Sequence, residues 1–144
     1  RNPGTVYHCN GIFAKYSKSF LKLKLLSGRL LYYFRPEIDE EKSIRFWGYD
    51  SQRHQVCKQY TYGAKLVENI VQATARDILA HALVILEGTK YETILHVHDE
   101  IVSRVAEGQG DIDEYCDLVT SLPDWGKDCP IAAEGWIGKY YKKD

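Results

Sequence analysis

The sequence predicts an α+β fold in which antiparallel hairpins pack with one long amphipathic helix. Residues 20–35 and 91–105 each alternate apolar and polar residues around a short interruption, and residues 64–87 repeat apolar residues at intervals of three and four. The chain has 144 residues, of which 44% are hydrophobic and 27% charged. That length and composition are typical of one soluble globular domain with its own core. The sequence contains no run of 18 apolar residues, which is the pattern that would predict a membrane span.

The first predicted hairpin runs from Phe20 to Arg35. Leucine alternates with lysine in its first strand, and Ser27-Gly28 interrupts the pattern, which is typical of a half-buried hairpin with one basic face. Pro36 and the acidic residues after it are expected to end this hairpin, because proline cannot donate to a strand ladder. Residues 44–49 are expected to form a third strand, and the polar stretch 50–59 predicts no regular element.

Residues 64–87 carry the strongest helical pattern, with Gly63 before it and Gly88 after it. The side opposite the apolar residues carries a stripe of long polar side chains at spacings of four, three and four: Lys65, Asn69, Gln72 and Arg76. Such a stripe is either a binding face or an ordinary solvated surface, and the pattern by itself leaves both open.

A second hairpin is predicted from strands at 91–97 and 101–105, with His98, Asp99 and Glu100 at or near its tip. Residues 111–122 then predict a short acidic helix stopped by Pro123.

The predicted elements after Pro123 are a closing strand at 130–136 and a basic tail at 139–143. Residues 1–60 are expected to be a basic, hairpin-rich part of a single domain, and 61–144 the part with the helix and second hairpin. Residues 1–65 hold 12 Lys and Arg against 5 Asp and Glu, a net charge of +7, and the remaining residues have a net charge of −8. This asymmetry favours either a surface for a polyanion or charges scattered over solvated faces.

The segment from His96 to Glu100 is the densest group of chemically active side chains in the sequence. Adjacent carboxylates attract a divalent cation, and oxygen ligands favour magnesium or manganese. His96 and His98 share a strand face, which permits a zinc-type site as a second interpretation. The third is a solvated turn, since Asp is common in turns.

Two of these features together resemble the C-terminal palm region of family A DNA polymerases, above all the phage-encoded branch. They are the segment 62–77 with Gln72 in its helix, and Val97-His98-Asp99-Glu100 about twenty residues later. Residues 25–33 and 132–136 resemble other segments of that branch, so the resemblance covers most of residues 20–142. It implies that the α+β unit is part of the palm of a right-hand polymerase.

The resemblance implies roles for three residues at the hairpin tip. Asp99 matches one of the two aspartates that hold the family's catalytic metal pair, and Glu100 matches the neighbouring, less essential carboxylate. Magnesium there would activate the primer 3′-hydroxyl and stabilise the leaving pyrophosphate. His98 matches a residue near the primer terminus and is expected to donate a hydrogen bond.

The resemblance also gives the polar stripe a DNA-binding role. Gln72 matches a glutamine that contacts the duplex near its end through the minor groove, where the acceptors are nearly the same for every base pair. Lys65, Asn69 and Arg76 are expected to face template and primer with it.

Nothing before Tyr62 supplies the family's other metal-binding aspartate or its nucleotide-gripping fingers helix. We therefore expect a C-terminal polymerase fragment that does not polymerise alone. Its expected partners are the N-terminal portion of the polymerase, template–primer DNA and deoxynucleoside triphosphates, in a bacterial host cytoplasm and with no membrane.

Two other functions are consistent with the residues. One is a stand-alone, non-catalytic nucleic-acid-binding module that uses the basic half and the polar stripe. The other is a small metal-dependent hydrolase built on His96, His98 and Glu100.

Overall fold

The computed structural model describes residues 4–40 and 43–141. The chain divides into two compact units, Arg1–Thr74 and Ala75–Asp144. Helix α1, Gly63–Leu86, begins in the first unit and ends in the second, so the division between the two units lies inside the helix. The predicted helix at 64–87 is confirmed, and Gly88 follows it with φ +82°, a value that favours glycine.

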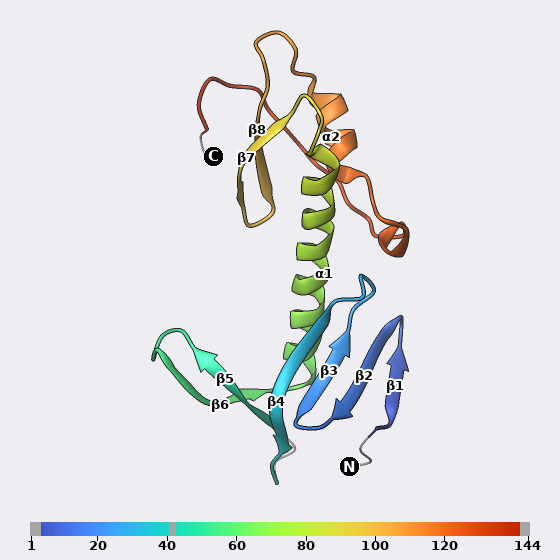
Figure 1. The fold of residues 1–144 in the computed structure, drawn as a ribbon, viewed down its shortest axis with the longest axis vertical. Coiled ribbons are helices and arrows are strands. Elements are labelled where there is room, and N and C mark those ends of the chain that lie inside the picture. The colour runs from blue at the N-terminus through green and yellow to red at the C-terminus, as the bar shows by residue number, and fades with distance from the viewer. Residues whose placement is uncertain (1–3, 41–42, 142–144) are drawn as a thin grey trace. The chain divides into compact units, whose positions relative to one another are not determined.

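Unit 1 is built on an antiparallel sheet in which each of the described strands pairs with the next along the chain (Figure 1). Its strands are β1 (Val6–Cys9), β2 (Ile12–Ser17), β3 (Phe20–Lys24), β4 (Leu30–Ile38), β5 (Ile44–Asp50) and β6 (Gln55–Thr61). The predicted β3–β4 hairpin and the predicted strand at 44–49 are confirmed. β1, β2 and β6 are strands that the sequence analysis did not predict.

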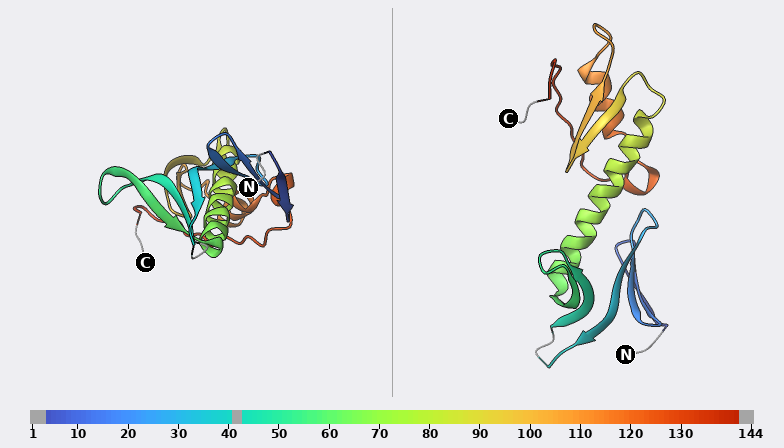
Figure 2. Two further views of the ribbon diagram at one scale, coloured as in Figure 1. Left: turned by 90° about the horizontal axis from the view of Figure 1, so that it is seen from below. Right: turned by 60° about the vertical axis from the view of Figure 1, so that its left-hand side comes forward.

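The prediction that Pro36 ends the first hairpin is wrong, because β4 continues through it to Ile38. The pairing of β4 with β5 shifts between Phe34 and Glu37, and Arg35 has φ +44°. The extra residue is a β-bulge, a place where a strand tolerates proline. β5 and β6 turn away from the first three strands beyond this point (Figures 1 and 2).

The sheet has two chemically different faces, because successive side chains of a strand point to opposite sides. One face, here called the inner face, includes Leu21, Leu23, Tyr33 and Phe46, which the strand registers place together. Leu23 and Tyr33 are buried, and Leu25, just after β3, is the most deeply buried residue of this unit. The inner face therefore contains the core of unit 1.

The first half of α1 is attached to this inner face by two polar contacts. Asn69 Nδ2 donates to the Tyr33 hydroxyl at 3.0 Å. Arg29 Nη2, from the loop between β3 and β4, donates to the Ala73 carbonyl at 2.6 Å. Because Tyr33 is only 6% exposed, its hydroxyl needs a partner inside the protein.

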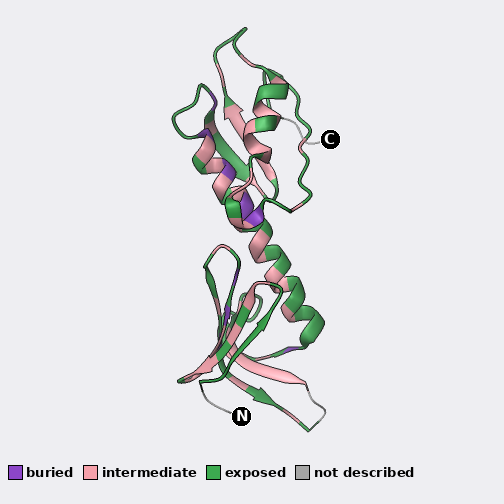
Figure 3. Ribbon diagram, turned by 90° about the vertical axis from the view of Figure 1, so that its right-hand side faces the viewer, coloured by how far each residue is buried: buried purple, intermediate pink, exposed green. Residues whose placement is uncertain are grey.

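Unit 2 covers one side of the second half of α1, where Ile78, Ala82 and Leu86 are buried at intervals of four (Figure 3). The other elements of unit 2 are β7 (Glu92–Val97), β8 (Glu100–Arg104), α2 (Ile112–Thr120) and the short 3₁₀-helix η1 (Asp124–Gly126). β7 and β8 form a two-stranded antiparallel sheet, which confirms the predicted hairpin. α2 confirms the predicted acidic helix, and Asp111 caps it by accepting from the Glu114 N–H.

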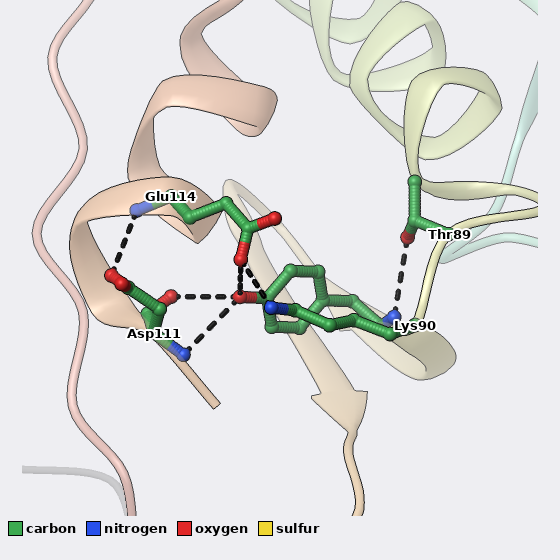
Figure 4. Close-up of polar contacts among 5 residues, drawn as sticks. Thr89, Lys90, Asp111 and Glu114 are labelled. Atoms are coloured by element: carbon green, nitrogen blue, oxygen red, sulfur yellow. Dashed lines mark hydrogen bonds and ion pairs between the residues drawn. The ribbon is translucent and has the colours of Figure 1, made fainter. Parts of the chain in front are cut away.

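Tyr91 joins the segment that follows α1 to α2. Figure 4 shows its partners Asp111 and Glu114, with Lys90 close to Glu114. Tyr91 is 3% exposed, and its hydroxyl lies 2.7 Å from Glu114 Oε2 and 2.9 Å from the Asp111 carbonyl. Lys90 Nζ reaches the same Glu114 oxygen at 2.5 Å. The ammonium of Lys90 and the hydroxyl of Tyr91 hold the pKa of Glu114 below its usual value, and Glu114 raises the pKa of Lys90.

The predicted closing strand at 130–136 is wrong. Residues 130–136 are all described, and none of them is in a strand. Strand pairing depends on a free edge in register, and a short stretch of sequence does not by itself supply one. Of the predicted basic tail, Lys139 is exposed, whereas residues 142 and 143 lie outside the described part of the chain.

By length and composition alone, α1 also meets the minimum for a membrane-spanning helix, with a mean hydropathy of 1.2 over 18 residues. One such helix is weak evidence, because core helices of soluble proteins pass the same test. Polar residues recur along its length, including Asn69, Gln72 and Arg76.

The contact of Lys90 with Glu114 predicts a pH-dependent contribution to stability. A depressed carboxyl pKa stabilises the fold above the unfolded pKa of about 4.3, and this contribution is lost as pH falls through the folded value. The raised pKa of Lys90 gives a contribution that is lost only as pH rises above about 10.4. We expect Glu114→Gln to lower the melting temperature at pH 7 and to leave it nearly unchanged at pH 2, as measured by circular dichroism.

Lys90→Met removes the same ion pair and should give the same dependence on pH. A difference between the wild-type chain and Glu114→Gln that stays constant from pH 7 to pH 2 would show that Glu114 acts by packing alone.

Candidate functional site

The candidate site is the tip of the β7–β8 hairpin. Val97 pairs with Glu100, which leaves His98 and Asp99 as a two-residue loop. His98 has φ +53°, a backbone conformation that is uncommon outside glycine but several-fold enriched in histidine, asparagine and aspartate. The residue types at the tip thus suit the tight turn.

A polar chain ties the hairpin to α2. The Ser103 hydroxyl of β8 lies 2.9 Å from the Tyr115 hydroxyl of α2 and 3.4 Å from the Thr93 hydroxyl of β7. The Tyr115 hydroxyl also lies within 3.4 Å of the Ile101 carbonyl. Burial raises the pKa of Tyr115, so at neutral pH its hydroxyl keeps the proton that these hydrogen bonds need.

The three predicted tip residues differ in their surroundings. His98 and Asp99 are exposed, whereas Glu100 is half-buried. Glu100 Oε2 accepts a hydrogen bond from the Tyr141 hydroxyl at 2.6 Å, and this bond raises the pKa of Tyr141. Asp99 is therefore accessible to a ligand, and Glu100 is held by a residue 41 positions away that the sequence analysis did not identify.

The tip offers two adjacent carboxylates as oxygen ligands for a hard cation. Magnesium is commonly bound by one or two carboxylates together with substrate phosphates and water, so Asp99 and Glu100 fit part of such a site. Among residues 4–40 and 43–141, no group of three or more His, Cys, Asp or Glu side chains lies close enough to hold a metal ion. Within that part of the chain, the zinc-type interpretation of His96 and His98 therefore has no third protein ligand.

The polar stripe of α1 lies partly against the protein and partly in solvent. Lys65 pairs with Glu68 at 2.7 Å, and this contact raises the pKa of Lys65. Asn69 is half-buried and donates to Tyr33, whereas Gln72 and Arg76 are exposed. Gln72 belongs to unit 1, and Arg76 belongs to unit 2 together with the hairpin tip.

Sequence comparison shows which kind of protein the chain is similar to. The chain is related to a segment of a phage DNA polymerase. It is 39% identical, over an alignment of 148 residues, to the DNA polymerase of Bacillus phage SP02. The alignment covers 100% of this chain and 22% of that polymerase, so the chain spans less than a quarter of the relative's length.

This similarity confirms the predicted resemblance to a phage DNA polymerase. No protein-family model matches the chain, and no solved structure matches it.

The contact between Asn69 and Tyr33 predicts a measurable coupling in stability. In a double-mutant cycle, Asn69→Ala and Tyr33→Phe should each destabilise the chain, and the double variant should lose about 1 kcal/mol less than the sum of the two. The free energies would come from urea unfolding followed by circular dichroism.

Gln72→Ala is the matched control, because Gln72 lies on the same helix and is exposed. It should change stability by less than about 0.5 kcal/mol. Additive losses from Asn69→Ala and Tyr33→Phe would contradict a structural role for the hydrogen bond.

Proposed function

We propose that this chain is the C-terminal palm portion of a family A DNA polymerase of the phage-encoded type. The parent protein would extend a primer on a DNA template by transferring nucleotides from deoxynucleoside triphosphates to the primer 3′-hydroxyl. One observation carries the proposal: the whole chain is similar to a segment of a phage DNA polymerase, and its helix with Gln72 precedes a hairpin whose tip is His98-Asp99.

In this proposal, Asp99 and Glu100 supply oxygen ligands for magnesium. When bound, the metal would lower the pKa of the attacking hydroxyl and neutralise charge on the leaving pyrophosphate. Exposed Asp99 would be the direct ligand. Glu100 has Oε2 engaged by Tyr141, so its other carboxylate oxygen would be the one available to the metal.

His98 and Gln72 would position the nucleic acid. Exposed His98 precedes Asp99 on the tip and can donate a hydrogen bond to the primer terminus. Exposed Gln72 can donate to minor-groove acceptors, with Lys65 and Arg76 from the same stripe contacting phosphates. Asn69 would support this face indirectly, since it is bonded to Tyr33.

The 144 residues alone would not polymerise. Polymerase catalysis by two metals needs carboxylates in addition to Asp99 and Glu100, and we propose that the remaining portion of the polymerase supplies the other aspartate and the groups that grip the triphosphate. The intact enzyme would act in the cytoplasm of an infected bacterial host.

We expect Asp99→Asn, in the longer polymerase that carries this segment, to reduce primer extension by at least about 10²–10³-fold. Losing a group that stabilises developing charge in the transition state costs about that much. The measurement is single-nucleotide incorporation on a labelled primer–template with magnesium and the matching triphosphate.

Asp117→Asn is the control, because Asp117 is an exposed carboxylate of the same unit, on α2. It should leave incorporation unchanged. Wild-type incorporation by Asp99→Asn would disprove the metal-binding role, and templated extension by the purified 144-residue chain would disprove the proposed need for further polymerase residues.

A further inference from the structure

The second face of the six-stranded sheet, here called the outer face, gathers aromatic and basic side chains. The strand registers place the following residues on it: Phe13, Lys15, Phe20, Lys22, Lys24, Tyr32, Phe34, Arg45, Trp47, Tyr49, Lys58 and Tyr60. These residues come from β2 to β6 and alternate in sequence with the inner-face residues that form the core of unit 1.

The charge of this sheet is strongly one-sided. Five cations occupy paired outer-face positions, against the one carboxylate of Glu37 at such a position, which is bonded to Lys58 at 2.8 Å. Asp39, just after β4, forms an ion pair with Arg45 at 3.0 Å. The cations of this face that pair with no carboxylate of residues 4–40 and 43–141 are therefore Lys15, Lys22 and Lys24. Among the paired strand positions that the structure describes, none on the inner face is Lys or Arg. Five of the twelve Lys and Arg among the first 65 residues therefore lie on one surface of the sheet.

The rings and cations of the outer face are interleaved. Lys22 Nζ lies 5.5 Å from the centre of the Tyr32 ring, which is 54% exposed. Arg45 lies 4.5 Å from the Tyr60 ring, which is 66% exposed. The Trp47 ring has Lys58 Nζ at 5.8 Å. Each of these rings thus has a cation from a neighbouring strand over one of its faces, which leaves the other face for a ligand.

We propose that the outer face is a binding platform for single-stranded nucleic acid, on which unpaired bases stack against Tyr32 and Tyr60 while the flanking cations contact phosphates. Stacking on exposed rings along a positively charged track is how proteins bind single strands without reading sequence. The cation charge complements the polyanion, and the strands hold the rings in fixed positions.

A single strand fits this surface better than a duplex or a protein partner. The bases of a duplex are stacked on one another and present only their edges, so exposed rings add little to duplex binding. Lysine is depleted from the cores of protein–protein interfaces, whereas Lys22 and Lys58 here lie among the rings. The platform goes beyond the proposed polymerase function and does not rest on it.

The test measures binding of a labelled 12-nucleotide oligo(dT) to the 144-residue chain by fluorescence anisotropy. We expect Tyr32→Ala and Tyr60→Ala each to weaken binding at least about fivefold, because stacking on an aromatic side chain contributes about 1–3 kcal/mol per base. Lys22→Gln and Lys58→Gln should reduce the slope of log affinity against log salt by about 0.7 each. Magnesium and nucleotides are absent, so failure here is distinct from failure of primer extension.

Tyr7→Ala is the matched control, because Tyr7 is 67% exposed on the inner face of edge strand β1. It should bind like the wild-type chain. Tyr32→Phe and Tyr60→Phe keep the rings and should stay within about twofold of wild type, and circular dichroism would confirm that every variant is folded. The proposal is overturned if the Ala variants bind like Tyr7→Ala, if a 12-base-pair duplex binds as tightly as oligo(dT), or if oligo(dT) does not bind at low salt.

Discussion

Helix α1 contributes to both units in different ways. Its second half buries Ile78, Ala82 and Leu86 in unit 2, whereas its first half is held to unit 1 by the hydrogen bonds of Asn69 and Ala73. Unit 1 has few deeply buried side chains, among them Leu23, Leu25 and Tyr33, and units of about 70 residues have little apolar surface to bury by themselves. Unit 2 buries Ile78 and Leu86 of the same helix. Apolar residues recur along all 24 residues of the helix, but the buried ones all lie in its second half.

This shared helix explains why its polar stripe is not uniform. In unit 1 the sheet and the β3–β4 loop supply hydrogen-bond partners for the helix. Asn69 donates to the Tyr33 hydroxyl, and the Ala73 carbonyl accepts from Arg29. The residue three positions after Asn69, Gln72, is exposed. Residues of the same polar stripe thus have different roles: Asn69 contributes to packing within unit 1, and only exposed residues such as Gln72 are directly available to a ligand.

Local patterns predicted the elements whose partners are close in sequence. The α1 helix, the β3–β4 hairpin and the tip with His98 and Asp99 follow from periodicity and turn residues alone. Asn10-Gly11 is an equally strong hairpin sequence, with φ of +46° and +78°, and it could have predicted β1 and β2. β6 was harder to predict, because apolar and polar residues occur on both of its faces and no alternation results.

The sequence predicted where the candidate site lies along the chain, but not which residues contact it. The tip is local, whereas the hydrogen bond between Tyr141 and Glu100 joins residues 41 positions apart, and no pattern in the sequence relates them. The same limit applies to the error at 130–136, since a strand requires a partner edge that the local sequence does not show.

The strand register places cations from several strands on the same face of the sheet. The net charge of +7 over the first 65 residues does not show where the basic side chains lie, because lysines scattered over every surface would give the same value. Because each strand alternates strictly, and because the bulge at Arg35 inserts one residue, Lys58 and Arg45 fall on the same face as Lys22. Without the bulge, β5 and β6 would place their cations on the opposite side of the sheet from those of β2 and β3. The irregularity that lets β4 pass through Pro36 is therefore also what makes the basic, aromatic face continuous.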